Sequence, residues 1–143
     1  MFLGTYEHVI DNKHRLRIPP KFRKEMQEGM IISKGNDGAL FLLPKQQFDV
    51  VLSKVSNVPM FDSSAQLSLR TLFSSASIVE EDSQGRFLLP SNLKAFAQIQ
   101  KEIVFVGVGL RVEIWAKETW LKYQEEANSN FDSILEGLKN YGI

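Results

Sequence analysis

The sequence predicts a mixed α+β protein, mainly β, in which two similar halves share one barrel-like core with pseudo-twofold symmetry and flanking helices. Three observations lead to this prediction: a segment that recurs about 70 residues later, short helices opened by proline, and hairpins punctuated by glycine. Of the 143 residues, 43% are hydrophobic and 24% are charged. This balance is typical of globular domains and argues against a largely disordered chain.

The recurring segment contains an Asp-x-x-x-Arg pattern followed by a proline. Residues 11–19 read DNKHRLRIP and residues 82–90 read DSQGRFLLP, so the Asp, Arg and Pro match at an offset of 71. Downstream, the triplet FDS at 61–63 recurs at 131–133. We therefore expect two homologous halves, residues 1–70 and 71–143. Because a half this small buries little core alone, we expect their hairpins to interlock around one shared core.

Each half is expected to begin with the same elements. A short strand leads into the Asp-x-x-x-Arg turn, and a second strand with alternating side chains follows. Proline then opens a short helix, at Pro20 in the first half and at Pro90 in the second, where Ser91 is the expected N-cap. The apolar residues of these helices should share one face: Phe22 and Met26 in the first, and Leu93, Phe96 and Ala97 in the second.

A hairpin and two helices are expected to complete each half. The hairpins are predicted at residues 31–43 and 103–115, each with glycine in its turn. Helices are predicted near residues 45–54, 63–76, 117–127 and 132–140, with Asp62 and Asp132 as N-caps. One stripe of side chains along the hairpins is expected to belong to the core or to an interface: Phe41, Leu43, Glu113 and Trp115.

Positive charge is concentrated at the start of a chain whose formal net charge is zero. Residues 1–24 contain six basic and two acidic residues, a local charge of +4. In the first turn, Arg15 and Arg17 point to one face of their strand, about 7 Å apart, and Lys13 and His14 lie at the tip. A two-stranded ribbon of this kind fits the DNA major groove, where arginine can bind guanine and lysine can bind phosphate. The sequence therefore predicts DNA contacts by Lys13, His14, Arg15 and Arg17.

The aspartates of the two turns are expected to stabilise them. Asp11 and Asp82 can accept hydrogen bonds from turn N–H groups and hold the arginine on the following strand, Arg15 or Arg86. Gly85 suits a positive φ in the second turn, and its counterpart is His14. Because the second turn is much less basic, we expect the first to dominate DNA binding and Arg86 to be structural. The competing interpretation is a pair of structural ion pairs on a solvated face.

Other classes of function find little support in the sequence. The absence of cysteine excludes disulfides, Cys-based zinc sites and a thiol nucleophile. No nucleophile motif or phosphate-binding glycine loop occurs, and an arginine four residues after each turn aspartate would keep the aspartate ionised. We therefore expect neither catalysis nor a small-molecule substrate, and no cofactor. His8, Asp11 and His14 lack a convincing ligand spacing, so no metal site is expected either.

A cytoplasmic location is the expectation from hydropathy. The longest apolar run, residues 103–110, has eight residues, far fewer than the roughly 20 of a membrane-spanning helix. The N-terminal residues MFLGTYEHVID lack the basic and long apolar regions of a signal peptide.

The opening segment MFLGTYEHVIDNKHRLRIPPKFRK, the duplicated Asp-x-x-x-Arg plan and the segment RTLFSSA at 70–76 resemble the MraZ family over nearly the whole chain. The resemblance implies the swapped-hairpin AbrB-like fold, with two copies per chain. It implies a nucleoid-associated transcriptional regulator of a bacterial cell-division and cell-wall gene cluster, which binds repeated boxes in double-stranded DNA as a ring-shaped homo-oligomer. The family motif falls on Asp11 and Arg15, and on Asp82 and Arg86. The sequence departs from the family at His14, where the first turn usually has glycine.

An interaction module remains the alternative, because AbrB-like folds also serve as antitoxins or scaffolds. Such proteins usually add a flexible partner-binding tail, whereas the C-terminal segment here is predicted to be helical with scattered charges.

One hairpin makes few phosphate contacts, so a single subunit should bind DNA weakly and a ring should bind it through avidity.

Overall fold

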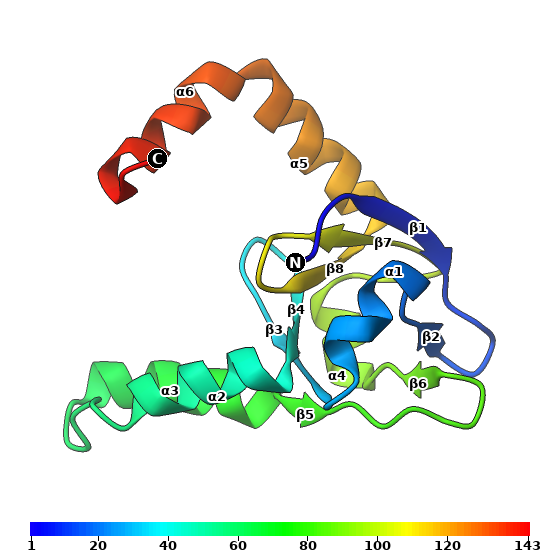
Figure 1. Ribbon diagram of the computed structural model, residues 1–143, viewed down its shortest axis with the longest axis horizontal. Helices are drawn as coiled ribbons and strands as arrows, with labels where there is room; N and C mark the ends of the chain where they lie inside the picture. The colour runs from blue at the N-terminus through cyan, green and yellow to red at the C-terminus, as the bar shows by residue number, and fades with distance from the viewer.

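The structure is a computed structural model that describes residues 1–143. It contains a six-stranded antiparallel sheet, a separate two-stranded ribbon and several helices, two pairs of which project away from the sheet (Figure 1). The mixed α+β class is therefore confirmed.

Residues of the first half form β1 (Thr5–Val9), β2 (Arg15–Arg17), α1 (Pro20–Arg23), the 3-10 turn η1 (Lys24–Met26), β3 (Met30–Lys34), β4 (Leu40–Pro44) and α2 (Lys45–Val55). Helix α3 (Ser63–Ser75) crosses from the first half into the second. Residues of the second half form β5 (Ser77–Ile78), β6 (Arg86–Leu88), α4 (Ser91–Phe96), β7 (Glu102–Gly107), β8 (Val112–Ala116), α5 (Lys117–Ser129), α6 (Phe131–Glu136) and the 3-10 turn η2 (Gly137–Tyr141). The predicted hairpins and helices are all present, with boundaries that differ by a few residues.

The strands of the two halves pair with one another. The order in the large sheet is β1-β7-β8-β4-β3-β5, so β1 lies beside β7 of the second half and β5 lies beside β3 of the first. The ribbon likewise joins β2 to β6. The sheet is open, because β1 and β5 each have one neighbour in it. The expected barrel-like body is therefore not observed as a closed barrel.

One hydrophobic core lies between the sheet, the ribbon and the short helices α1 and α4. Leu16 of β2 and Phe87 of β6 are buried in it together with Phe105 and Ile114 of the sheet. Phe22 of α1 lies edge-on to two aromatic rings, with centroid distances of 5.4 Å to Phe2 and 5.1 Å to Tyr6. Because the core draws on both halves, it places the ribbon and its two turns at one fixed edge of the molecule.

A smaller cluster covers the other face of the sheet under α5. Trp115 packs against Trp120 and Tyr123 of that helix, with ring centroids 5.3 and 4.9 Å apart. Trp115 and Glu113 are buried, whereas Phe41 and Leu43 are half-buried. Of the predicted stripe, Trp115 is thus part of the packing between the sheet and this helix, and Phe41 lies under the Arg111 guanidinium, 4.4 Å from its ring centroid.

Three local predictions are wrong and one is confirmed. Asp62 caps α3 by accepting a hydrogen bond from the Ala65 N–H at 3.0 Å, as predicted. Asp132 lies in the first turn of α6, which begins after Asn130. Ser91 makes no capping hydrogen bond, because α4 begins one residue earlier than expected, with Pro90 as its N-cap. Phe96 is partly exposed and carries the Lys34 ammonium over its ring, 5.2 Å from the centroid.

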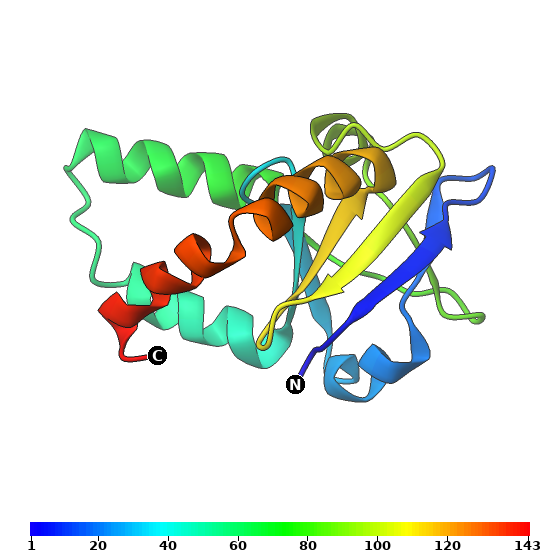
Figure 2. The same cartoon turned by 90° about the horizontal axis from the view of Figure 1, so that it is seen from above.

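The longer helices form two arms. The pair α2 and α3 and the pair α5 and α6 project from the same side of the sheet, with the C-terminus at the end of the second arm (Figures 1 and 2). Helices α2, α5 and α6 contain no buried residue. None of the helices combines the length and the apolar composition that a membrane-spanning helix requires.

Candidate nucleic-acid interface

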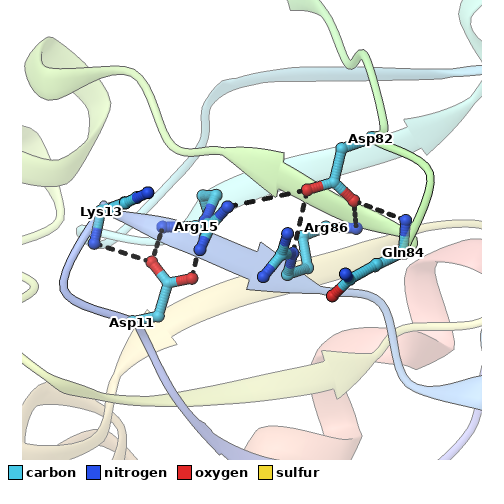
Figure 3. A network of polar contacts seen from close by, with 6 residues as sticks. All are labelled: Asp11, Lys13, Arg15, Asp82, Gln84 and Arg86. Carbon is cyan, nitrogen blue, oxygen red and sulfur yellow. Dashed lines mark hydrogen bonds and ion pairs between the residues drawn. The ribbon is translucent and has the colours of Figure 1, made fainter.

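The first turn, residues 11–15, is organised by one carboxylate. Asp11 Oδ1 accepts hydrogen bonds from the backbone N–H groups of Lys13 (2.9 Å) and Arg15 (2.8 Å). Asp11 Oδ2 accepts a hydrogen bond from Arg15 Nε at 2.7 Å (Figure 3). One side chain therefore satisfies the turn backbone and fixes the guanidinium.

The second turn, residues 82–86, repeats this geometry. Asp82 Oδ1 accepts from the N–H groups of Gln84 (2.8 Å) and Arg86 (3.0 Å), and Oδ2 accepts from Arg86 Nε at 2.9 Å. The left-handed position is occupied by Gly85 with φ 75° here and by His14 with φ 60° in the first turn. Histidine thus adopts the backbone conformation for which glycine has no steric cost.

The two turns lie side by side because β2 pairs with β6. Leu16 opposes Phe87 in this ribbon, and both side chains enter the core. The Arg15 guanidinium, already bound to Asp11, also lies 3.8 Å (Nη1 to Oδ2) from Asp82 of the other turn (Figure 3). Sequence reasoning missed this contact between the halves. The repeated Asp-x-x-x-Arg pattern could have indicated this contact, because two similar strands can pair antiparallel about a shared axis.

Both aspartates are held in the ionised form. Burial acts to raise the pKa of Asp11, but the hydrogen bonds from the backbone and side chain of Arg15 and from the backbone of Lys13 outweigh it and lower the pKa. For Asp82, the backbone hydrogen bond from Arg86 is the main cause of a lowered pKa; burial opposes it, and further hydrogen bonds reinforce it. The turns are therefore fixed by charge-assisted contacts at neutral pH.

The predicted DNA-contact residues divide into two groups. Lys13, His14 and Arg17 are exposed, and neither Lys13 nor Arg17 makes an ion pair. Arg15 is only 25% exposed and is bound to Asp11 through Nε. Of its two terminal nitrogens, Nη1 lies in ion-pair range of Asp82 and Nη2 has no partner, so Arg15 combines a fixed position with one free donor group.

A neighbouring histidine is affected by this cluster of charges. His8 of β1 is half-buried; burial lowers its pKa and the charge of Arg17 lowers it further, while Asp11 opposes the shift. Nowhere in the structure do three or more His, Asp or Glu side chains form a group placed to hold a metal ion.

Residues outside the predicted set also surround the turns. Arg23 of α1 donates a hydrogen bond to Glu81 at 2.9 Å beside the second turn. Lys94 of α4 lines a hollow with His14 of the first turn. Sequence reasoning counted Arg23 only as part of a basic segment and did not consider Lys94. The 71-residue offset, which pairs Arg23 with Lys94, could have drawn attention to both.

The fold and the ribbon at its edge define a class of protein. It is a mixed α+β chain that presents two adjacent Asp-x-x-x-Arg turns from one two-stranded ribbon. A family model described as "MraZ protein, putative antitoxin-like" matches residues 1–71 and again residues 72–139. The chain belongs to this family.

Several relatives that match over the whole chain are named as transcriptional regulators. The chain is 41% identical over 143 residues to the transcriptional regulator MraZ of Alkaliphilus oremlandii, and 43% identical over 143 residues to that of Clostridium beijerinckii. The corresponding protein of Clostridium acetobutylicum is 41% identical. Each of these matches covers 100% of both chains.

Proposed function

We propose that this protein is a sequence-specific DNA-binding transcriptional regulator that acts on the promoter of a cell-division and cell-wall gene cluster. It binds repeated boxes in double-stranded DNA as a ring-shaped homo-oligomer, and this activity associates it with the nucleoid in the cytoplasm. The observation that carries the proposal is the first turn: Asp11 fixes its backbone, and Lys13 and Arg17 extend from it without acidic partners. The names of the full-length relatives support the regulatory role.

The ribbon supplies a suitable shape for base contacts. Leu16 anchors β2 in the core, so Arg17 on the next position points outward. Asp11 holds the Nε of Arg15 and Asp82 lies 3.8 Å from its Nη1, so the side chain is already positioned and loses little conformational entropy when it binds a guanine edge. Arg15 and Arg17 are therefore the proposed base-reading residues, and Lys13 and His14 at the tip are proposed to contact the backbone.

The chain is proposed to consist of two interlocked AbrB-like repeats, residues 1–70 and 71–143, related by a pseudo-twofold axis. The strand order supports this, because it reads the same from both ends when β1, β3 and β4 are exchanged for β5, β7 and β8. Pairing of the first strand of each half with the other half supports the swapped arrangement. Two consecutive matches of the family model support the boundaries.

Assembly into a ring is supported by the two helical arms. Their solvent-facing surface carries large apolar side chains, among them Phe61 (95% exposed), Phe131 (56%) and Ile134 (51%). Exposed apolar surface of this extent marks an interaction site. Copies of the turn on neighbouring subunits would then bind successive boxes, and the linkage would raise the affinity without additional net charge.

The proposal is tested by fluorescence anisotropy with the DNA upstream of the protein's own gene. Wild type is compared with Arg17→Ala and Arg15→Ala, beside a scrambled duplex, at two salt concentrations. The control is Lys54→Ala, which removes an exposed unpaired lysine from α2, far from the turns. We expect specific binding that each arginine variant loses by about 1–3 kcal/mol and the control retains.

Equal and weak binding of wild type to both duplexes would contradict the proposal. It would favour the alternative of an antitoxin-like or scaffolding module, which the family description and the exposed apolar arms suggest. The partner of such a module would be a protein that covers the arms.

A further inference from the structure

Each turn tip lies against the short helix of the opposite half. At the second turn, a Cβ atom placed on Gly85 would lie 2.9 Å from Arg23 Nη1 of α1. At the first turn, His14 lines a hollow of about 530 Å³ together with Ser91 and Lys94 of α4. His14 matches Gly85, and Lys94 matches Arg23, at the offset of 71. A basic residue from the other half therefore lies beside each tip.

The two basic residues differ in their partners. Arg23 is neutralised by Glu81 at 2.9 Å. The position that matches Glu81 in the first half is Ile10, which is buried in the core. Lys94 makes no ion pair and is half-exposed. Its charge is consequently free to act on whatever the first turn binds.

Lys94 also connects the turn to a second basic hollow. A hollow of about 860 Å³ is lined by Lys94, Lys101, Lys117 and Lys122. Lys117 is engaged by Glu7 and Glu102, and Lys122 lies 3.8 Å from Glu118. Lys101, like Lys94, has no acidic partner. The unpaired positive charge thus extends from the tip of the first turn past α4.

We propose that Lys94 is a phosphate contact that the second half adds to the DNA interface of the first turn. This inference rests on the proposed function. A hairpin in the major groove is flanked by phosphate groups, and residues beside its tip are placed to reach them. The compact, rotatable ammonium of lysine suits a phosphate contact that carries no sequence information. The second turn lacks this contact because Glu81 already occupies Arg23.

The test measures the salt dependence of DNA binding for wild type, Lys94→Gln, Lys94→Arg and the control Lys54→Gln. We expect Lys94→Gln to weaken binding to promoter and scrambled duplexes by the same factor, several-fold. The slope of log K against log salt should flatten by about 0.9 per subunit that contacts DNA. Lys94→Arg should retain the slope, and Lys54→Gln should behave as wild type.

The outcomes separate the two proposals. If wild type binds the promoter and Lys94→Gln keeps the slope of the Lys54→Gln control, the inference is overturned and the proposed function stands. If wild type does not prefer the promoter, the proposed function fails and the inference fails with it. Melting temperature and light-scattering mass are measured for each variant. A change in either for Lys94→Gln, with the salt slope unchanged, would assign Lys94 a structural role and overturn the inference.

Discussion

At the scale of single residues, the two turns form a natural comparison. They share the carboxylate contacts and the left-handed position, yet one turn has His14 there and the other has Gly85. An L-residue with a side chain adopts this conformation at a cost of about 1–2 kcal/mol, which glycine avoids. His14 is exposed and forms no side-chain hydrogen bond that offsets this cost.

Exchanging the left-handed residues should therefore have opposite effects in the two turns. His14→Gly is expected to raise the free energy of unfolding by a few tenths to about 1 kcal/mol. Gly85→His is expected to lower it by about 1–2 kcal/mol, the backbone cost, because the Arg23 Nη1 that lies 2.9 Å from the new Cβ is the end of a flexible side chain and can move aside. Urea denaturation of both variants checks the pair. Equal effects of the two substitutions would show that the turns tolerate a side chain alike.

The carboxylates of the turns should make stability depend on pH in acid. The pKa of Asp11 and the pKa of Asp82 are both lower in the folded protein than the ordinary value of 3.8. Their stabilisation is therefore fully present above that ordinary value and is lost as the pH falls through the lower folded-state pKa. Urea denaturation from neutral to acidic pH should show wild type and Asp82→Asn converging at low pH. A constant difference at every pH would contradict this role.

At the scale of elements, the sequence predicted local structure better than pairing. The helices of the arms were expected within a few residues of their limits, because apolar spacing and the Asp62 cap are local signals. The pairing of β2 with β6 and the approach of Arg15 to Asp82 join residues far apart in the chain. Strands of three residues carry too little periodicity to specify such partners. The same reason left Lys94 outside the predicted site.

Glu113 is a charged residue among the apolar residues of β8, and its hydrogen bonds stabilise the strand. It is buried in β8, where it accepts hydrogen bonds from Arg111 Nη2 at 2.7 Å and from Trp115 Nε1 at 3.1 Å. Glu113→Ala leaves both donors without this acceptor, so we expect a loss of about 1–3 kcal/mol in the free energy of unfolding. Glu118→Ala on the exposed face of α5 is the control and should cost less than about 0.5 kcal/mol. Similar losses would indicate that the buried carboxylate contributes little.

At the scale of the whole molecule, the arms require an explanation that one chain does not supply. Short helices are marginally stable in water and depend on packing of an apolar face. Helix α5 packs on the sheet through Trp120 and Tyr123, but α6 contains no buried residue, and Phe131, Ile134 and Leu138 are exposed. A second copy of the chain would bury these side chains and place several turns in one assembly, as the proposed ring requires.

Assembly and DNA affinity are therefore expected to be lost together. The double variant Phe131→Glu with Ile134→Glu places charge on the exposed apolar face of α6, far from the turns (Figure 1). Light scattering should show wild type as a multiple of 16.3 kDa and the variant near 16.3 kDa. Because avidity contributes on the order of 10²–10⁴ to binding by linked sites, promoter affinity should fall by at least about 10². Lys139→Glu, which changes charge without removing apolar surface, should assemble and bind as wild type. A monomeric variant that keeps wild-type affinity would refute the dependence on assembly, because its single pair of turns would then suffice for binding.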